Sequence, residues 1–251
     1  MIRIAGRTDT GILRTNNEDA FFISTEPVGI FDALIVVCDG MGGHSFGEVA
    51  SRVCIEAVVE DLLSEPVDNP MLIIEQAVSM ANLAVRKESE RRGGTDIMGT
   101  TLVLAGIIGD HVYAANIGDS RLYLIGGKDY TITQISKDHT FVEEQVERGL
   151  LERDSEEYEK QKNMITRAVG VYAEVEADLY ELTLSDDQYL LLCTDGLTNM
   201  VSDLLIKNLA LDISFDLEKR VETLTALANR NGGRDSQLMG RNKTIFAIFS
   251  R

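Results

Sequence analysis

The stretch Val36-Val37-Cys38-Asp39-Gly40-Met41-Gly42-Gly43-His44 decides the fold, because an apolar run ends there in one carboxylate followed by a glycine-rich segment. A short continuous apolar run of this kind is typical of a buried β-strand, and glycines let a backbone approach a ligand closely. Far downstream, the run Tyr189-Leu190-Leu191-Leu192-Cys193-Thr194-Asp195-Gly196 repeats the pattern. We therefore predict two buried strands, each of which ends in an Asp-Gly pair.

Two carboxylates brought together at strand ends, Asp39 and Asp195, would repel each other unless a cation lay between them. Hard divalent cations such as Mg²⁺ and Mn²⁺ prefer oxygen ligands of this kind. Asp119 and Asp235 also lie within three residues of a glycine. A single Asp-Gly pair is most often an ordinary turn, so the prediction of a metal site depends on the two strands that share the pattern.

The composition indicates one globular domain over residues 1–251. The chain has 24 basic and 41 acidic residues, a formal net charge of −17, and 44% hydrophobic residues. A basic stripe is absent from the sequence, which argues against a nucleic-acid partner, and the charge disfavours an anionic membrane surface. We expect no nucleic-acid or membrane partner, and we expect a monomer.

The three cysteines, Cys38, Cys54 and Cys193, have apolar neighbours and no paired spacing, so we predict buried, unreactive thiols rather than a disulfide framework or a zinc site. The first twenty residues contain six charged residues and no apolar core of a signal peptide. No run of 18 apolar residues occurs. A cytoplasmic location is the expectation that fits these features.

Apolar periodicity predicts two long helices, over residues 47–63 and 71–92, between early and middle strands of one α+β domain. Shorter helices are predicted over 141–149, 203–210 and 217–229. The predicted strands cover 21–24, 33–38, 100–108, 111–117, 121–125, 130–135, 178–184, 188–193 and 244–249.

Short polar or glycine-containing links between successive strands predict hairpins. The links are Gly109-Asp110, Gly118-Asp119, Gly126-Gly127 and Ser185-Asp186-Asp187.

The densely charged residues 150–162 predict a mobile surface segment.

The segment Gly11-Ile12-Leu13-Arg14-Thr15-Asn16-Asn17-Glu18-Asp19 precedes the first predicted strand and holds one arginine near two acids. An arginine fork there could bind a phosphate beside a metal, although exposed stretches of this composition are common. The pair Gly42-Gly43 lacks the Gly-Lys-Ser/Thr of a P-loop, which disfavours a nucleotide-binding loop of that type.

Taken in order, these segments resemble the metal-dependent serine/threonine phosphatases of the PP2C (PPM) family, especially its bacterial single-domain branch. The resembling segments are Gly11–Asp19, Asp39–His44 with Gly47-Glu48, Gly99-Thr100-Thr101, Asn116–Arg121, Lys137-Asp138-His139, Ile165–Gly170 and Cys193–Leu197. The resemblance implies a central antiparallel β-sandwich flanked by helix pairs, an α/β/β/α arrangement in four layers, with a variable flap near residues 141–166. It also implies phosphorylated proteins, the products of a serine/threonine kinase, as substrates.

The resemblance further implies two Mg²⁺ or Mn²⁺ ions at one end of the sandwich and hydrolysis by a metal-activated water without a nucleophilic side chain. By this resemblance, Asp39 bridges both metals, the Gly40 carbonyl ligates one, and Asp195 holds the other. The remaining roles are water-mediated metal contacts for Glu18 and Asp19, phosphate binding for Arg14, and a weaker third metal site at Asp119 with Asp195.

The sequence departs from the family pattern near its C-terminus. The family motif is Gly-Gly-x-Asp-Asn-x-Thr, whose Asp ligates a catalytic metal, whereas Gly232-Gly233-Arg234-Asp235 is followed here by Ser236. Either residues 236–241 are an insertion and Asp235 keeps its role, or Arg241 takes the Asp position and repels a cation. We favour Asp235, because it directly follows the glycine pair and a six-residue excursion costs little.

A general acid is harder to assign, because some family members carry a His directly after the metal-bridging Asp-Gly, where this chain has Met41. His44 could protonate the leaving group or could simply line the loop. Three functions stay open at this point: a protein phosphatase, a regulatory PP2C-like binding module without turnover, and a phosphatase for small phosphate metabolites.

Overall fold

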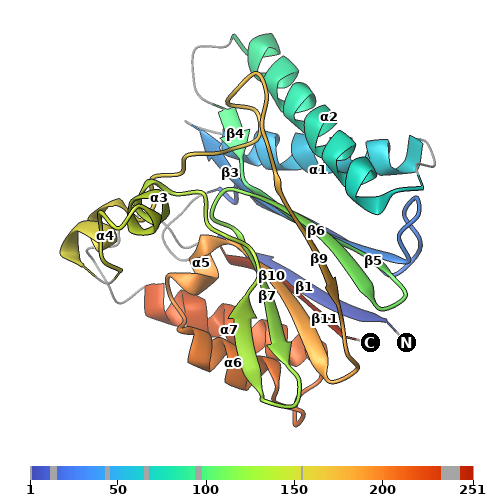
Figure 1. Ribbon diagram of the computed structural model, residues 1–251, viewed down its shortest axis with the longest axis vertical. Helices are drawn as coiled ribbons and strands as arrows, with labels where there is room; N and C mark the ends of the chain where they lie inside the picture. Colours follow the sequence, from blue (N-terminus) through green and yellow to red (C-terminus); the bar gives the residue numbers. More distant parts are fainter. Residues whose placement is uncertain are drawn as a thin grey trace.

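Two antiparallel β-sheets lie face to face at the centre of the computed structural model (Figure 1). The structure describes residues 2–11, 16–42, 46–64, 68–93, 98–153 and 155–232, and the backbone of 244–250. The first sheet has the order β1 (Arg3–Asp9), β11 (Thr244–Ser250), β10 (Gln188–Cys193), β7 (Arg121–Gly126) and β8 (Thr131–Gln134). The second has the order β2 (Asp19–Ser24), β3 (Ala33–Gly42), β5 (Leu102–Ile108), β6 (His111–Ile117) and β9 (Asp178–Thr183), with β4 (Met98–Thr100) beside the end of β3.

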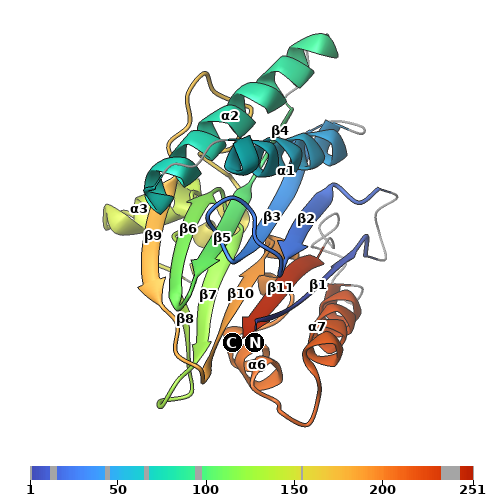
Figure 2. The ribbon, with the colours of Figure 1, turned by 90° about the vertical axis from the view of Figure 1, so that its right-hand side faces the viewer.

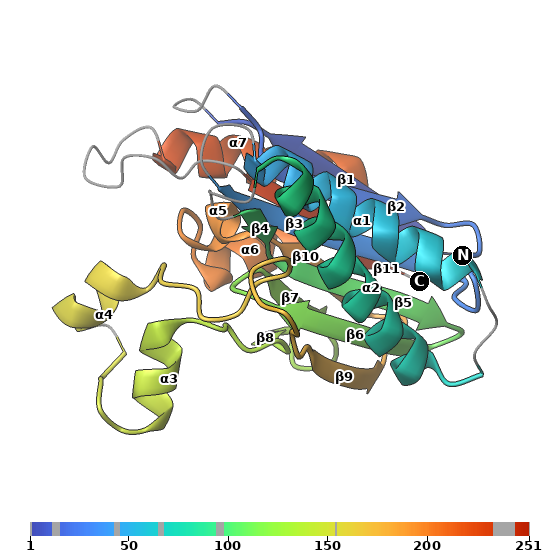
Figure 3. The same ribbon diagram turned by 90° about the horizontal axis from the view of Figure 1, so that it is seen from above.

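Helices cover the outer face of each sheet, which confirms the predicted four-layer α+β architecture (Figure 1). The long helices α1 (Phe46–Ser64) and α2 (Pro70–Arg91) pack on the second sheet (Figure 2). The first sheet is covered by α6 (Asp203–Ala210) and α7 (Leu217–Gly232), with the single turn α5 (Asp195–Thr198) beside them. The helices α3 (Phe141–Glu147) and α4 (Glu156–Gln161) lie outside the sandwich (Figure 3).

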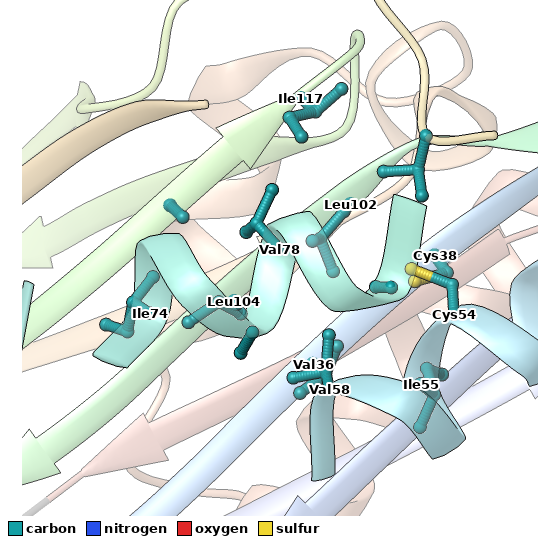
Figure 4. Close-up of a cluster of buried hydrophobic side chains, with 14 of the residues drawn as sticks. Val36, Cys38, Cys54, Ile55, Val58, Ile74, Val78, Leu102, Leu104 and Ile117 are labelled. Atoms are coloured by element: carbon teal, nitrogen blue, oxygen red, sulfur yellow. The ribbon is translucent and has the colours of Figure 1, made fainter. Parts of the chain in front are cut away.

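The apolar run that opens β3 is explained by burial on both faces of the strand. Side chains alternate along a strand, and Leu34, Val36 and Cys38 join the core under α1 and α2. Ile35 and Val37 point instead into the core between the two sheets. In Figure 4, Val36 lies beside Val58 of α1 and Cys38 lies beside Cys54. A strand between a helix layer and a second sheet therefore needs the unbroken run that the sequence shows.

The three cysteines, all within the described part of the chain, are buried free thiols, as predicted. Burial raises the pKa of Cys193 to about 12, so its thiolate is scarce at neutral pH and the thiol is unreactive. Of the described helices, none is long and apolar enough to span a bilayer.

The prediction that the strand ends at Asp39 is wrong, because β3 continues to Gly42. Gly40, Met41 and Gly42 pair with Thr100, Gly99 and Met98 of β4. The sequence 98–108 is correspondingly split at Thr101 into β4 and β5 rather than forming one strand. The two glycines within residues 40–42 predict a loop, but pairing with β4 holds these residues in an extended conformation.

Two of the four predicted hairpins are confirmed, and two are wrong. The links 109–110 and 126–127 join β5 to β6 and β7 to β8, which are paired neighbours. The links 118–119 and 185–187 instead carry the chain from one sheet to the other, because β6 and β9 belong to the second sheet and β7 and β10 to the first. A short glycine turn and alternating apolar residues do not distinguish a hairpin from a crossing between stacked sheets.

Two smaller predictions also need correction. The sequence does not predict strand β1, because the charged residues Arg3, Arg7 and Asp9 leave no clear alternation of apolar and polar side chains; only Ala5 is buried. Within the segment predicted to be mobile, residues 156–161 form α4, whose first turn is capped by the Ser155 hydroxyl that accepts a hydrogen bond from the Tyr158 N–H. Local capping thus produces a helix where charge density alone suggested irregular chain.

The core between the sheets should dominate stability. Leu192 of β10 is fully buried in this core, so Leu192→Ala should lower the free energy of unfolding by about 2–5 kcal/mol, as expected when a buried leucine leaves a cavity. Leu204 of α6 is 61% exposed, and Leu204→Ala should change the free energy by no more than about 0.5 kcal/mol. Urea denaturation of both variants measures the difference, and equal losses would contradict this assignment of the core.

Candidate active site

Strand pairing brings the predicted acidic residues of the two sheets to one end of the sandwich. Asp19 of β2 lies opposite Asp39 of β3 in the antiparallel register. The Thr194 hydroxyl, one residue before Asp195, donates a 3.1 Å hydrogen bond to the Asp19 carboxylate. Because Thr194 follows β10 of the other sheet, this bond joins the two sheets where Asp39 and Asp195 lie.

Glycine at positions 40 and 47 allows three backbone segments to meet beside Asp39. A Cβ on Gly40 would lie 2.0 Å from the Gly47 carbonyl oxygen and 2.5 Å from that of Glu18. A Cβ on Gly47 would lie 2.8 Å from the Gly40 carbonyl oxygen and 2.9 Å from Oε1 of Glu18. The Glu18 carboxylate and the Gly40 carbonyl therefore converge beside Gly47, and only glycine fits between them.

Two threonines hold the backbone of Asp39. The Asp39 N–H donates to the Thr101 hydroxyl at 2.9 Å, and the Asp39 carbonyl accepts from the Thr101 N–H at 2.9 Å and the Thr100 hydroxyl at 3.0 Å. The Thr101 and Ser120 hydroxyls are 2.7 Å apart. Ser120 follows Asp119, so this contact couples the positions of two predicted metal ligands through buried side chains.

Asp119 lies at the crossing from β6 to β7 and is only 7% exposed. Burial raises the pKa of its carboxyl well above the usual range, and the negative charges of Asp195, Asp39 and Asp138 raise the pKa further. The repulsion means that these carboxylates lie near one another. A divalent cation among them would remove it, and the donors are all oxygen, as Mg²⁺ and Mn²⁺ prefer.

The motif Lys137-Asp138-His139 supports the Asp119 turn, a role that the sequence did not indicate. Asp138 binds the Arg121 guanidinium with contacts of 2.6–3.0 Å. Nδ1 of His139 accepts a hydrogen bond from the Gly118 N–H at 3.1 Å, and the Gly118 carbonyl accepts one from the His139 N–H at 2.9 Å. Asp138 thus binds the chain two residues after Asp119 and His139 binds the residue before it, so together they set the position of Asp119. His139 thus has a structural role at this turn.

An open cavity of about 270 Å³ lies beside Asp119 and Asp195. Residues near the sandwich form one side, and residues 158–163 form the other. The lining residues are Asp119, Arg121, Asp138, Tyr158, Glu159, Lys162, Asn163, Asp195, Thr198 and Asn199. Every one of them is polar or charged, so the cavity suits a hydrophilic ligand.

Three predicted site residues, Arg14, His44 and Asp235, lie outside the described residues. Within the described ranges, no three His, Cys, Asp or Glu side chains are grouped so that they could hold a metal ion by themselves. A ligand set for two ions therefore needs more than the described carboxylates, such as the Gly40 carbonyl, water and Asp235. The described carboxylates and the Gly40 carbonyl fit such a set, because all of them offer oxygen donors to a hard cation. A bound cation would also offset the repulsion among the carboxylates.

Comparisons with known proteins agree with the fold. The protein phosphatase 2C profile matches residues 14–235. The chain is 34% identical to the protein phosphatase PhpP of Streptococcus pneumoniae over 91% of this chain and 92% of PhpP. It is 36% identical to the serine/threonine protein phosphatase PstP of Mycobacterium tuberculosis over 94% of this chain, but it spans only 44% of the length of PstP.

Among solved structures, the catalytic domain of the serine/threonine protein phosphatase PstP in complex with two manganese ions superposes with a TM-score of 0.81. The two are 33% identical, and the match covers 99% of this chain and 97% of that one. The fold is thus that of the serine/threonine protein phosphatase class to which PstP belongs. The chain belongs to the protein phosphatase 2C family.

The buried His139 should make stability depend on pH. Burial lowers the pKa of His139 below the usual value of about 6.5. The positive charges of Arg167 and Lys137 lower this pKa further, whereas the hydrogen bond to Asp178 raises it by a smaller amount than burial lowers it. Above pH 6.5 the ring is neutral in both states. As the pH falls below 6.5, the unfolded chain binds a proton first, so stability falls by at most about 1.4 kcal/mol per pH unit until the folded pKa is reached.

Urea denaturation between pH 7.5 and 5 tests this expectation. His139→Gln, whose amide oxygen can still accept from Gly118, should flatten the slope, whereas His111→Gln at a half-exposed strand position should keep it. An unchanged slope in His139→Gln would show that other groups cause the acid sensitivity.

Proposed function

We propose that this protein hydrolyses the phosphate esters of serine and threonine in proteins, with two Mg²⁺ or Mn²⁺ ions bound at the acidic end of the sandwich. The observation that carries the proposal is that Asp119 is buried and that the negative charges of Asp39 and Asp195 act on it. Asp39 belongs to a strand of one sheet and Asp195 follows a strand of the other. Carboxylates kept close together in this way cost stability unless a cation is bound. Membership in the PP2C family supports the same reaction.

We assign the metal ligands as the carboxylates of Asp39, Asp195 and Asp235 and the carbonyl of Gly40, with Glu18 and Asp19 acting through water. Bound divalent cations would supply the Lewis acidity that attack of water on a phosphate ester requires. The chain's own contribution is to hold the oxygen donors in place before substrate arrives. The hydrogen bonds from Thr101 and Thr194 serve this purpose, because they fix the Asp39 backbone and the Asp19 carboxylate.

Arg14 would bind the phosphate of the substrate, since a guanidinium matches two phosphate oxygens at once. His44 is the candidate general acid for the leaving alkoxide. The cavity beside Asp119 and Asp195 is open and polar throughout, so it could receive a hydrophilic segment of a phosphorylated protein. The substrates would be phosphoproteins made by a serine/threonine kinase, and a third, weaker cation would bind at Asp119 with Asp195.

Activity should require a divalent cation. Hydrolysis of p-nitrophenyl phosphate should appear with Mn²⁺ or Mg²⁺ and vanish with excess EDTA, and Asp39→Asn should lower the turnover rate at least about a hundredfold, because a central ligand and its charge are lost. The variant should keep the circular dichroism spectrum of the wild type. Asp110→Asn, in the β5–β6 turn, is the matched control and should retain activity. Full activity in EDTA would refute the proposal.

Asp119 and Asp235 should differ in metal binding. Calorimetric titration of Asp119→Asn with Mn²⁺ should show both tight ions and a lost weak one, with most turnover lost. Asp235→Asn should lose one tight ion, because a carboxylate ligand is removed. If Asp235→Asn binds both ions tightly, Asp235 is not a ligand. A wild-type protein that binds phosphopeptide but never turns over with Mn²⁺ would be a binding module instead.

A further inference from the structure

The flap, residues 141–166, leaves and rejoins the rest of the chain at one fixed point. Thr140 and Ile165 form an isolated β-bridge. The Phe141 N–H donates to the Met164 carbonyl at 2.8 Å, and the Thr166 N–H donates to the His139 carbonyl at 2.8 Å. The base of the flap is therefore tied to the same loop that supports Asp119, while α3 and α4 project away from the sandwich (Figure 3).

A buried carboxylate lies inside the flap. The buried residues of α3 are Val142 and Glu143, and α4 contributes no buried residue among those described. Glu143 is only 5% exposed. Its Oε1 accepts a 2.6 Å hydrogen bond from the Tyr158 hydroxyl, and its Oε2 lies 2.5 Å from the Arg153 guanidinium.

These contacts make Glu143 the link between the two halves of the flap. Tyr158 is on α4, and Arg153 lies on the connection before it. Hydrogen bonds to a charged carboxylate are stronger than neutral ones, and a buried carboxylate needs such partners. Burial and the hydrogen bond to Glu143 raise the pKa of Tyr158 above its usual range, so the hydroxyl stays protonated and keeps donating.

Tyr158, Glu159, Lys162 and Asn163 form the flap side of the cavity that opens beside Asp119 and Asp195. We propose that Glu143 is a positioning residue that holds α4 against this cavity, so that the α4 side chains contact the residues flanking the phosphorylated residue of a protein substrate. This inference rests on the proposed phosphatase activity. A small aryl phosphate has no flanking residues, so its hydrolysis depends on the metal end and not on α4.

The test compares Glu143→Ala and Tyr158→Phe with wild type on two substrates, a phosphothreonine peptide and p-nitrophenyl phosphate, both with Mn²⁺. For Glu143→Ala, the KM for the peptide should rise about tenfold, the size expected for losing about 1.4 kcal/mol of charge-assisted hydrogen bonding, while kcat holds. Tyr158→Phe should raise this KM less. The double variant should be no worse than Glu143→Ala alone, because both changes remove one shared interaction.

Glu147→Gln is the matched control. Glu147 is also on α3 and also forms a 2.6 Å ion pair, but its partner is Lys137 at the surface. The variant should behave as wild type on both substrates. Equal losses on peptide and p-nitrophenyl phosphate in Glu143→Ala would overturn the proposal, because Glu143 would then act on the whole site.

Limited trypsin digestion gives a readout that does not need activity. Cleavage after Arg153, Lys160 and Lys162 should be about tenfold faster in Glu143→Ala, because α4 opens more often, and unchanged in Glu147→Gln. Unchanged cleavage in Glu143→Ala would refute the link between α3 and α4. If the wild type hydrolyses neither substrate with Mn²⁺, the proposed phosphatase function fails, and digestion still decides whether Glu143 holds α4.

Discussion

Electrostatic repulsion among neighbouring, largely enclosed carboxylates is the constraint on which the site end of this molecule depends. Asp119 has little exposure to water and lies within range of Asp39, Asp138 and Asp195. Such an arrangement survives in a folded protein only if rigid surroundings enforce it. The β-sandwich meets this condition, because the carboxylates are delivered by both sheets and each sheet is backed by its own helix layer.

Neutral hydrogen bonds, together with one ion pair, provide the enforcement. Thr100 and Thr101 hold the backbone of Asp39, while Thr194 spans from the first sheet to the second by binding Asp19. Around Asp119, the Arg121–Asp138 pair offsets one of the nearby negative charges, and His139 binds Gly118 on both its N–H and C=O. Most of these partners carry no charge, so they position the carboxylates without competing with a cation for them.

The sequence predicted the layers better than the connections between them. The unbroken apolar run at 33–38 has to lie between two layers, and the long amphipathic helices have to cover a sheet, so burial alone identifies these elements. Which sheet receives a strand after a tight turn depends on long-range packing, so the crossings at 118–119 and 185–187 looked like hairpins. The metal-binding role of Asp119 is predicted by family resemblance. The roles of Ser120 and His139 depend on contacts between residues far apart in the chain, so only the structure shows them.

The sandwich and the flap are held together by different physics. Between the sheets, fully buried aliphatic side chains such as Leu190 and Leu192 resist local opening. In the flap, the Glu143 carboxylate joins α3 to α4 through two polar partners, one of which, Arg153, is 63% exposed. An ion pair with an exposed partner contributes far less than a buried apolar core. The cavity lies between these two parts, so its Asp119 and Asp195 side is backed by the apolar core and its flap side is held by fewer contacts. Under the proposed function, changes in the flap would therefore alter which proteins are accepted without moving Asp39 or Asp195.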